Sequence, residues 1–237
     1  MRSFILAISL LVAGLSLRAQ HTGYSFKFGP TMGIQQWDGF DRGPLFGYHA
    51  DIQVENISET DARTLFAALG YHQRGSANRF RYSVLGRNEI RQTTTKFIFN
   101  NAVLTAGGKQ LYALQKLQGH VSIALRGEVN INYKTQIDDQ VVVNDTRFTQ
   151  SFPQEQFVNR FLYGIDIGAG IEFPLSPTLD GLLEFKVSPD LSRQYFQPPV
   201  PGFDPISGNN RIYPERRINN ISFELSFGIR LIRYSEY

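Results

Sequence analysis

Apolar and polar residues alternate one by one along most of this chain. In the clearest run, 161–173, the odd positions are Phe, Tyr, Ile or Ala, while the even positions include three glycines, Asp166 and Glu172. The segment Phe223–Leu231 repeats the pattern near the end of the chain. Successive side chains point to opposite faces of a strand, so each run predicts a β-strand with one apolar and one polar face. Helical periodicity is nearly absent, and the pattern predicts an all-β protein.

The alternation predicts eight strands, separated by polar or turn-rich stretches. They span 22–36, 45–57, 62–76, 92–106, 118–134, 159–173, 180–192 and 218–234. The pattern is weakest in the fourth strand, where Phe97 and Phe99 share a face but Asn100-Asn101 breaks the alternation, so we expect a β-bulge there. The even number of strands places both chain ends on the same side.

The predicted connections alternate in length. Those after the second, fourth and sixth strands are mostly shorter than those after the third, fifth and seventh: 58–61, 107–117 and 174–179 against 77–91, 135–158 and 193–217. Short turns at one end and long loops at the other are typical of a barrel in a bacterial outer membrane, with the long loops outside the cell. We therefore predict an eight-stranded antiparallel up-and-down transmembrane β-barrel.

Alternation alone does not decide which face of the strands lies inside. The polar face is rich in small residues, its charges are mixed in sign, and aromatic residues gather toward the strand ends, which favours lipid against the apolar face. The interior would then hold a paired polar network. Its members are Lys27, His49, Asp51, Glu55, His72, Arg74, Arg126, Glu128, Asp166, Glu172, Glu184, Lys186, Glu224 and Arg230. The alternative is a soluble secreted barrel or sandwich with the apolar face inside.

The first residues have the composition of a secretory signal. Arg2 precedes an apolar run that ends near Ala19, so we expect a signal peptide over 1–19 and the barrel domain over 20–237. The alternative for this segment is an N-terminal membrane anchor. Without residues 1–19, the number of Lys and Arg residues falls by two (Arg2 and Arg18), from 24 to 22, against 21 Asp and Glu. No basic stripe is interleaved with aromatics, and nucleic acid is not an expected partner.

The order and texture of these segments resemble the porin-family (OmpX-like, PorT-like) outer-membrane β-barrels of Bacteroidota. The matching pieces are Ala19-Gln20, Phe26–Gly29, Leu69–Gly75, Tyr163–Phe173 and Phe223–Leu231. The resemblance covers essentially the whole mature chain, and it implies the fold and the outer-membrane location. It specifies the role poorly, because its motifs belong to the barrel and carry no chemistry. The tail Ser235-Glu236-Tyr237 extends slightly beyond the usual family end.

Candidate chemistry is sparse. The chain has no cysteine, which excludes disulfides and thiolate sites. His49 and His72 with Asp51 and Glu55 could form a metal site or an acid–base pair, but an interior hydrogen-bond network is the favoured interpretation. Some barrels of this size modify lipid A, and only His72, close to Ser76, could serve such an enzyme. No catalytic residue, metal or cofactor is predicted.

The long loops are the expected interaction surfaces. The loop 193–217 is rich in proline and aromatics, and its predicted docking residues are Tyr195, Phe196, Pro198, Pro199, Phe203 and Tyr213. The loop 135–158 carries further apolar residues. The alternative for both loops is a self-packed cap over the barrel mouth.

The preferred functional hypothesis is a structural or interaction barrel without an open pore, embedded in outer-membrane lipid and binding other outer-membrane proteins through these loops. One alternative, implied by the PorT-like resemblance, is an accessory subunit of a secretion or assembly machine. A small-solute porin is a further alternative, although wide lumens need about 16–18 strands. A lipid-modifying enzyme is the remaining one.

Overall fold

The computed structural model describes residues 21–36, 42–57, 62–83, 90–115, 117–137, 142–143, 146–147, 155–203 and 209–234. The predicted signal peptide and Trp37 lie outside these residues. Among the described residues, no helix is long and apolar enough to cross a membrane.

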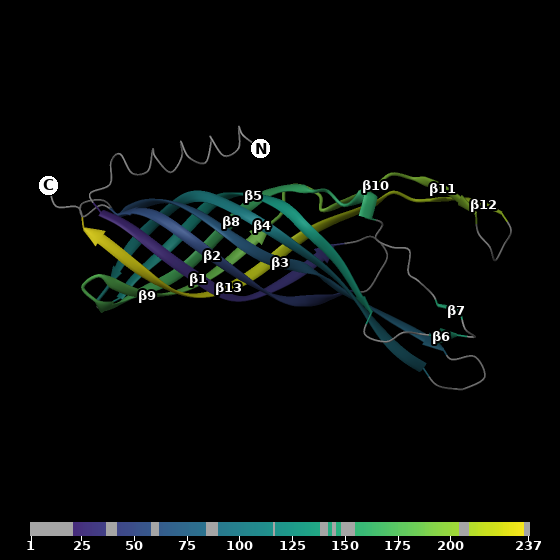
Figure 1. Cartoon of the computed structure of the whole chain (residues 1–237), viewed down its shortest axis with the longest axis horizontal. Coiled ribbons are helices and arrows are strands. Elements are labelled where there is room, and N and C mark those ends of the chain that lie inside the picture. Colours follow the sequence, from purple (N-terminus) through teal and green to yellow (C-terminus); the bar gives the residue numbers. More distant parts are fainter. Residues whose placement is uncertain are drawn as a thin grey trace.

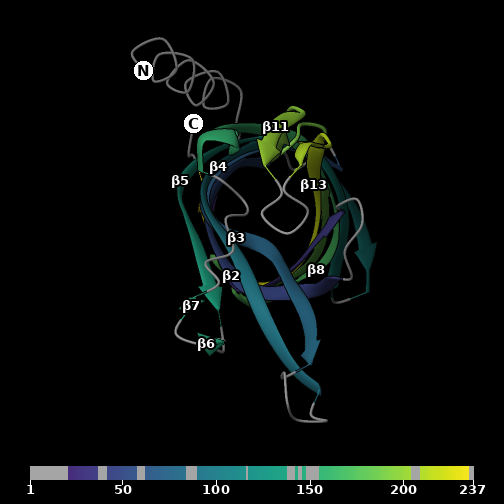
Figure 2. The ribbon, with the colours of Figure 1, turned by 90° about the vertical axis from the view of Figure 1, so that its right-hand side faces the viewer.

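Eight strands form a closed ring, as the alternation predicts. They are β1 (His21–Gln36), β2 (Arg42–Ile57), β3 (Arg63–Ser83), β4 (Ile90–Leu114), β5 (Leu117–Ile137), β8 (Phe161–Ser176), β9 (Leu179–Pro189) and β13 (Arg216–Tyr234). Each pairs antiparallel with the next along the chain, and β13 pairs with β1 to close the barrel. Figure 1 shows the strands crossing the long axis at a slant, and Figure 2 shows the ring seen from one end.

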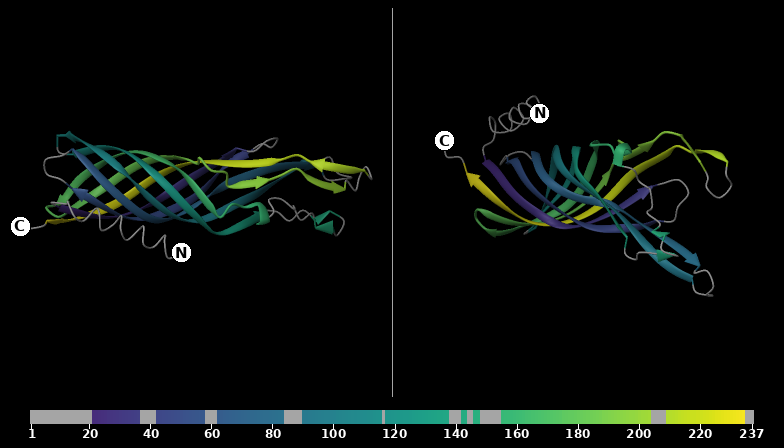
Figure 3. Two further views of the ribbon diagram at one scale, coloured as in Figure 1. Left: turned by 90° about the horizontal axis from the view of Figure 1, so that it is seen from above. Right: turned by 45° about the vertical axis from the view of Figure 1, so that its right-hand side comes forward.

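The two ends of the barrel differ. At the end that we call the terminal end, His21 of β1 pairs with Tyr234 of β13, and β4 turns tightly into β5, with Leu114 opposite Leu117. At the opposite end, which we call the hairpin end, β3 and β4 stay paired as far as Ser83, well beyond the ring. This projection, the β3–β4 arm, is plain in Figure 3.

A second arm extends β9 and β13 at the hairpin end. It consists of β10 (Tyr195–Gln197), which pairs with the start of β13, and the hairpin of β11 (Val200–Phe203) and β12 (Asn210–Tyr213). The short strands β6 (Val142–Val143) and β7 (Thr146–Arg147) and the 3-10 turn η1 (Glu155–Phe157) lie between β5 and β8. The predicted loops 77–91 and 193–217 are therefore largely paired strand.

The predicted connection 107–117 is wrong. β4 continues to Leu114, and its pairing with β3 continues through Gly107 and Gly108 to Gln110. The two glycines suggested a turn, but a Cβ at Gly107 would lie 2.4 Å from that of Ala124 on β5. This glycine permits close contact between neighbouring strands. Pairing with β3 and β5 continues past it, and the chain turns only after Leu114.

The apolar faces of the strands point outward. The large hydrophobic side chains that are exposed on the barrel include Phe46, Ile52, Leu69, Ile123, Leu125, Phe161, Ile167, Phe185, Phe227 and Ile229. The interior face carries the buried polar side chains. The orientation expected from small residues and mixed charges is therefore the observed one, and a soluble barrel with an apolar interior is excluded by this arrangement.

A β-bulge lies opposite Asn100-Asn101, but on β5 and not in the fourth strand, where the sequence predicts it. Asn100 faces Asn132 and Asn101 faces Asn130, so the extra residue is Ile131 on β5.

Phe97 and Phe99, next to this bulge, depart from the rule that large apolar side chains face outward. They are 1% and 0% exposed, on the same face of β4 as the buried Asn101 and Val103. The extra residue in β5 shifts its alternation, and the Tyr133 ring lies 5.3 Å from that of Phe99. Aromatic side chains therefore pack inside the barrel at its hairpin end.

Candidate functional site

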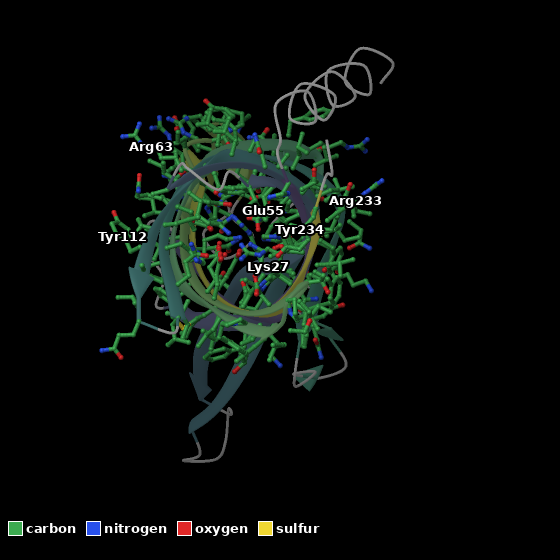
Figure 4. All side chains as sticks on the ribbon, turned by 90° about the vertical axis from the view of Figure 1, so that its left-hand side faces the viewer. Lys27, Glu55, Arg63, Tyr112, Arg233 and Tyr234 are labelled. Carbon is green, nitrogen blue, oxygen red and sulfur yellow. The ribbon has the colours of Figure 1, made fainter. Side chains whose placement is uncertain are left out.

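The barrel interior, which we call the lumen, holds the densest cluster of charged residues in the described chain. All fourteen members of the predicted polar network are buried there. Figure 4 shows Lys27 and Glu55 pointing into the ring, whereas Arg63, Tyr112 and Arg233 point away from it. Strict alternation along each strand places these side chains, because every second residue must face inward.

Arg230 and Lys109 organise the network toward the terminal end. Lys109 Nζ lies 2.8 Å from Glu55 and 2.9 Å from Glu172, so one β4 amine joins β2 to β8. Arg230 on β13 lies 2.8 Å from Glu55 and 2.6 Å from both Glu172 and Asp180. The two cations thus share two carboxylates, and charge-assisted bonds of this kind are the stronger class of hydrogen bond.

His72 lies in the middle of the lumen between two acids. Its Nε2 is 2.9 Å from Asp51 and its Nδ1 is 2.9 Å from Glu224. Ionised carboxylates only accept hydrogen bonds, so both ring nitrogens must carry a proton when both acids are ionised. Lys186 Nζ reaches Glu224 from β9 at 3.3 Å.

The hairpin side of the network spans the whole lumen. Arg74 on β3 lies 2.8 Å from Glu128 and 3.3 Å from Asp190, which directly follows β9. In the ring, β9 is the strand opposite β3, so this contact crosses the full diameter. Arg126 lies 2.5 Å from Asp166 and also pairs with Asp190.

A small void lies between these ion pairs. A void lined by Lys27, Asp51, Glu184 and Lys186 has a volume of about 10 Å³. A cavity must hold roughly 10–15 Å³ for one water molecule. A larger cavity of about 240 Å³ opens at the terminal end beside Glu172, and its lining side chain Arg230 is engaged by acids.

The lumen carries an excess of acidic groups. In the described chain it holds six Lys and Arg side chains (Lys27, Arg74, Lys109, Arg126, Lys186 and Arg230). Nine carboxylates face them: Asp51, Glu55, Glu128, Asp166, Glu172, Asp180, Glu184, Asp190 and Glu224. Three histidines, His49, His72 and His120, are buried among them. Because nine minus six is three, an interior in which all nine carboxylates are ionised is neutral only if all three histidines are charged.

Lys109, His120, Asp180 and Asp190 belong to the network but are absent from the predicted set. Lys109 falls in the segment that was expected to be a loop. The other three lie at even-numbered positions, on the same face of their strands as Ser122 or Glu184. The alternation in the sequence could therefore have identified them. Asp190 lies just beyond β9 and is reached by two arginines.

The paired histidines are arranged for structure. The rings of His49 and His72 are 5.5 Å apart, but His49 contacts Ser226 at 2.8 Å and Thr31 at 3.1 Å. Among the described residues no group of three or more His, Cys, Asp and Glu side chains could hold a metal ion. The hydroxyl of Ser76 donates to Gln35 at 2.6 Å, and His72 is occupied by its two acids, so the two residues form no nucleophile–base pair.

The predicted docking residues divide into three groups. Tyr195 is not an exposed docking residue: it is 0% exposed, and its ring meets that of Phe157 at 6.1 Å. Phe196, Pro198 and Pro199 are exposed on the second arm. The backbones of Phe203 and Tyr213 lie in β11 and β12, and their side chains fall outside the described part.

The fold and the lumen define a class: a closed eight-stranded β-barrel with an apolar exterior and a charged interior. No protein-family model matches the sequence, and no curated protein is significantly similar to it. Among solved structures, neisserial surface protein A (NspA) shares 11% identity over 88% of this chain and 96% of its own, with a TM-score of 0.42.

Two further solved structures are similar to the same degree. The outer membrane protein OprG from Pseudomonas aeruginosa shares 6% identity over 90% of this chain and 96% of its own, with a TM-score of 0.46. A major outer membrane protein from Thermus thermophilus shares 13% identity over 90% of this chain and 99% of its own, with a TM-score of 0.44. No role is carried over from likenesses this distant.

Proposed function

We propose that this chain is a sealed β-barrel of a bacterial outer membrane that presents two hairpin arms to the outside. The observation that carries the proposal is the closed, charge-filled lumen beneath an apolar exterior. Side chains such as Phe46, Leu125 and Phe161 are 72–76% exposed. Each large apolar side chain left in water forfeits about 1.5–3 kcal/mol of burial, so a surface of this kind calls for lipid.

The orientation follows from the two ends. Barrels of this class have short turns on the periplasmic side and longer loops outside the cell. The tight β4–β5 turn lies at the terminal end, together with His21 and Tyr234, and we assign this end to the periplasm. The two arms then project from the cell surface.

The lumen supports a sealed barrel over a porin. Arg74 crosses the diameter to Asp190, and the void beside Lys27 and Glu184 holds only about 10 Å³. A permeant sugar needs a continuous water-filled path, and eight strands give an interior only wide enough for side chains. The ion pairs fill that width.

Purified full-length protein, inserted in a planar lipid bilayer, tests the seal. We expect no stable conductance steps above the lipid background in concentrated KCl. The matched sample is the same protein after heat denaturation, which controls for detergent leakage. Reproducible open steps from folded protein would refute the sealed barrel.

The arms are the proposed interaction surface. Ile212 on β12 is 71% exposed and Phe196 on β10 is 37% exposed, both on the second arm. Apolar side chains beyond a membrane barrel favour contact with other proteins. An accessory role in a secretion or assembly machine, which the PorT-like resemblance implies, uses the same arms.

Excising the β3–β4 arm tests the role of the arms separately from the folding of the barrel. β2 pairs with β3 only as far as Asn78, and β5 pairs with β4 only as far as Thr95. Asn78 and Thr95 face each other, so replacing 79–94 by Asn-Gly should leave a foldable barrel.

Cross-linking and co-purification from solubilised outer membranes then compare the excised and intact proteins. We expect partners of the intact protein to be lost on excision of this arm or of 198–214. Recovery of the same partners from both excised proteins would contradict the role of the arms, while leaving the sealed barrel untouched.

A further inference from the structure

Exposed cations lie at the hairpin end of several neighbouring strands of the ring. Lys134 on β5, Arg160 before β8 and Arg193 after β9 are exposed, and they lie on consecutive members of the ring. Lys96 on β4 and Arg217 on β13 extend the series on either side. We call these five residues the basic collar.

Backbone contacts make the collar continuous. Asn130 N donates to Arg160 O at 2.8 Å, which ties the start of β8 to β5. Asn159 Nδ2 donates to Arg193 O at 2.6 Å, and Arg217 pairs with Phe196 in the ladder of β10 and β13. The guanidinium of Arg193 lies 5.5 Å above the Phe196 ring.

The collar lies directly beside exposed apolar side chains. Phe161, which follows Arg160, is 76% exposed, and Leu191, two residues before Arg193, is 58% exposed. Ile131, three residues before Lys134, is 59% exposed. A rise of about 3.3 Å per residue places these cations within roughly 10 Å of the apolar edge, which is the depth of lipid headgroups.

In the described part of the chain, acidic side chains offset only part of the charge of the collar. Outside the lumen at this end, the one described acidic side chain is Glu215, which pairs with Arg217 and also attracts Arg193. The hydrogen bond from Arg217 holds the pKa of Glu215 below its usual range. No ion pair joins Lys134 or Arg160 to a described acid.

The terminal end provides a contrast in how its cations are arranged. Over the described residues, the exposed Lys and Arg side chains outside the lumen there are Arg63 on β3 and Arg233 on β13, and β1 and β2 separate them in the ring. Figure 4 shows the two on opposite sides of the barrel. Isolated cations of this kind do not form a continuous row. A row on consecutive strands is therefore a feature of the hairpin end.

Charge complementarity indicates what the row would bind. At headgroup depth it favours an anionic lipid, since each Lys or Arg near such a surface contributes about 1 kcal/mol. Several such cations on neighbouring strands can contact one multiply charged headgroup, which two cations on opposite sides of a barrel cannot do.

We propose that the basic collar binds the phosphate groups of an anionic glycolipid of the lipid A class in the outer leaflet, with Lys134, Arg160 and Arg193 as its principal contacts. Guanidinium groups bind phosphate through paired hydrogen bonds, and the lysine supplies a point charge. The exposed rings and aliphatic side chains below the collar meet the acyl chains of the same lipid. This inference rests on the proposed membrane placement.

The test uses the full mature protein in phosphatidylcholine nanodiscs, with native mass spectrometry to count retained lipid. The probes are bisphosphorylated lipid A and its dephosphorylated form. The variant carries Lys134→Gln, Arg160→Gln and Arg193→Gln, and the matched control carries Arg63→Gln and Arg233→Gln at the opposite rim. We expect an at least tenfold weaker retention of lipid A by the triple variant, and less than a twofold change for the control.

Further measurements complete the test. Heat-dependent gel mobility verifies that each variant is folded, and the charge-preserving variant Lys134→Arg, Arg160→Lys, Arg193→Lys should retain lipid A within about threefold. Equal retention of the dephosphorylated form, or an equal loss in the opposite-rim control, would overturn the collar. So would full competition by millimolar inorganic phosphate, which would assign the site to free anions. Failure to insert into any bilayer would instead overturn the membrane placement.

Discussion

A single side chain, His72, holds much of the central lumen together. It is 1% exposed and joins Asp51 on β2 to Glu224 on β13, strands that do not pair with each other. Removing one partner from a buried charged group leaves the others uncompensated, which costs more than the pair itself contributes. The histidine is therefore a structural cation at the centre of the barrel.

Replacing His72 by alanine should lower the free energy of unfolding by about 3–5 kcal/mol, because two buried carboxylates lose their shared donor. Urea unfolding in detergent micelles, followed by tryptophan fluorescence or gel mobility, measures the change. His21→Ala, at the partly exposed terminal end, is the matched control and should cost no more than about 1 kcal/mol, the value of its ring contact with Tyr234. A loss for His72→Ala no larger than that of the control would contradict the structural role.

At the scale of an element, β3 depends on one glycine shortly before it leaves the ring. Gly75 has φ +152°, in the region that favours glycine, and a Cβ there would lie 1.8 Å from the carbonyl oxygen of Phe97 on β4. The β2–β3 register also shifts nearby, between Pro44 and His49. A side chain at position 75 would therefore force β3 and β4 apart where the arm begins.

Gly75→Ala should destabilise the barrel by about 1–3 kcal/mol, since it adds backbone strain and a contact with the neighbouring strand. Gly127→Ala is the matched control: no atom lies within 4 Å of its added Cβ, on the exposed face of β5. The control should be neutral or slightly stabilising, because alanine loses less conformational entropy than glycine. Equal unfolding midpoints for the two variants would refute the close approach of β3 and β4.

At the scale of the whole molecule, the ion pairs across the lumen act as its plug. Arg74 and Arg126 both reach Asp190, and they are the cations nearest the hairpin end of the network. Without these two, four of the six Lys and Arg side chains would face nine carboxylates. The lumen would then be both wider and more acidic.

The double variant Arg74→Gly, Arg126→Gly should show small conductance steps that the native protein lacks. The steps should favour cations, because the remaining lumen charge is negative, and a KCl gradient measures this as a reversal potential of the corresponding sign. The matched control, Lys134→Gly with Arg160→Gly, removes two positive charges outside the lumen. Its barrel should stay closed. Anion-selective steps, or none in a variant shown to be folded, would contradict the plug.

Alternation by itself determined the eight strands of the ring and the face that each presents, though not their full lengths, because a period of two residues is a local property. It placed Asp166, Glu172 and Glu224 inside, and the mixed signs of the polar face indicated that charges must pair there. The partners could not be read from it: which strand lies opposite which depends on ring closure and register. Arg74 and Asp190 are 116 residues apart and meet only across the closed barrel.

Tertiary structure also decided the departures from simple alternation. Ile131 becomes an extra residue in β5, which brings Tyr133 beside Phe99, and β4 stays paired through Gly107, where the neighbouring strand is too close for a side chain. The collar likewise exists only in the folded chain, since Lys134, Arg160 and Arg193 become neighbours when their strands pair. Local pattern fixes faces, whereas contacts between distant segments require the closed ring.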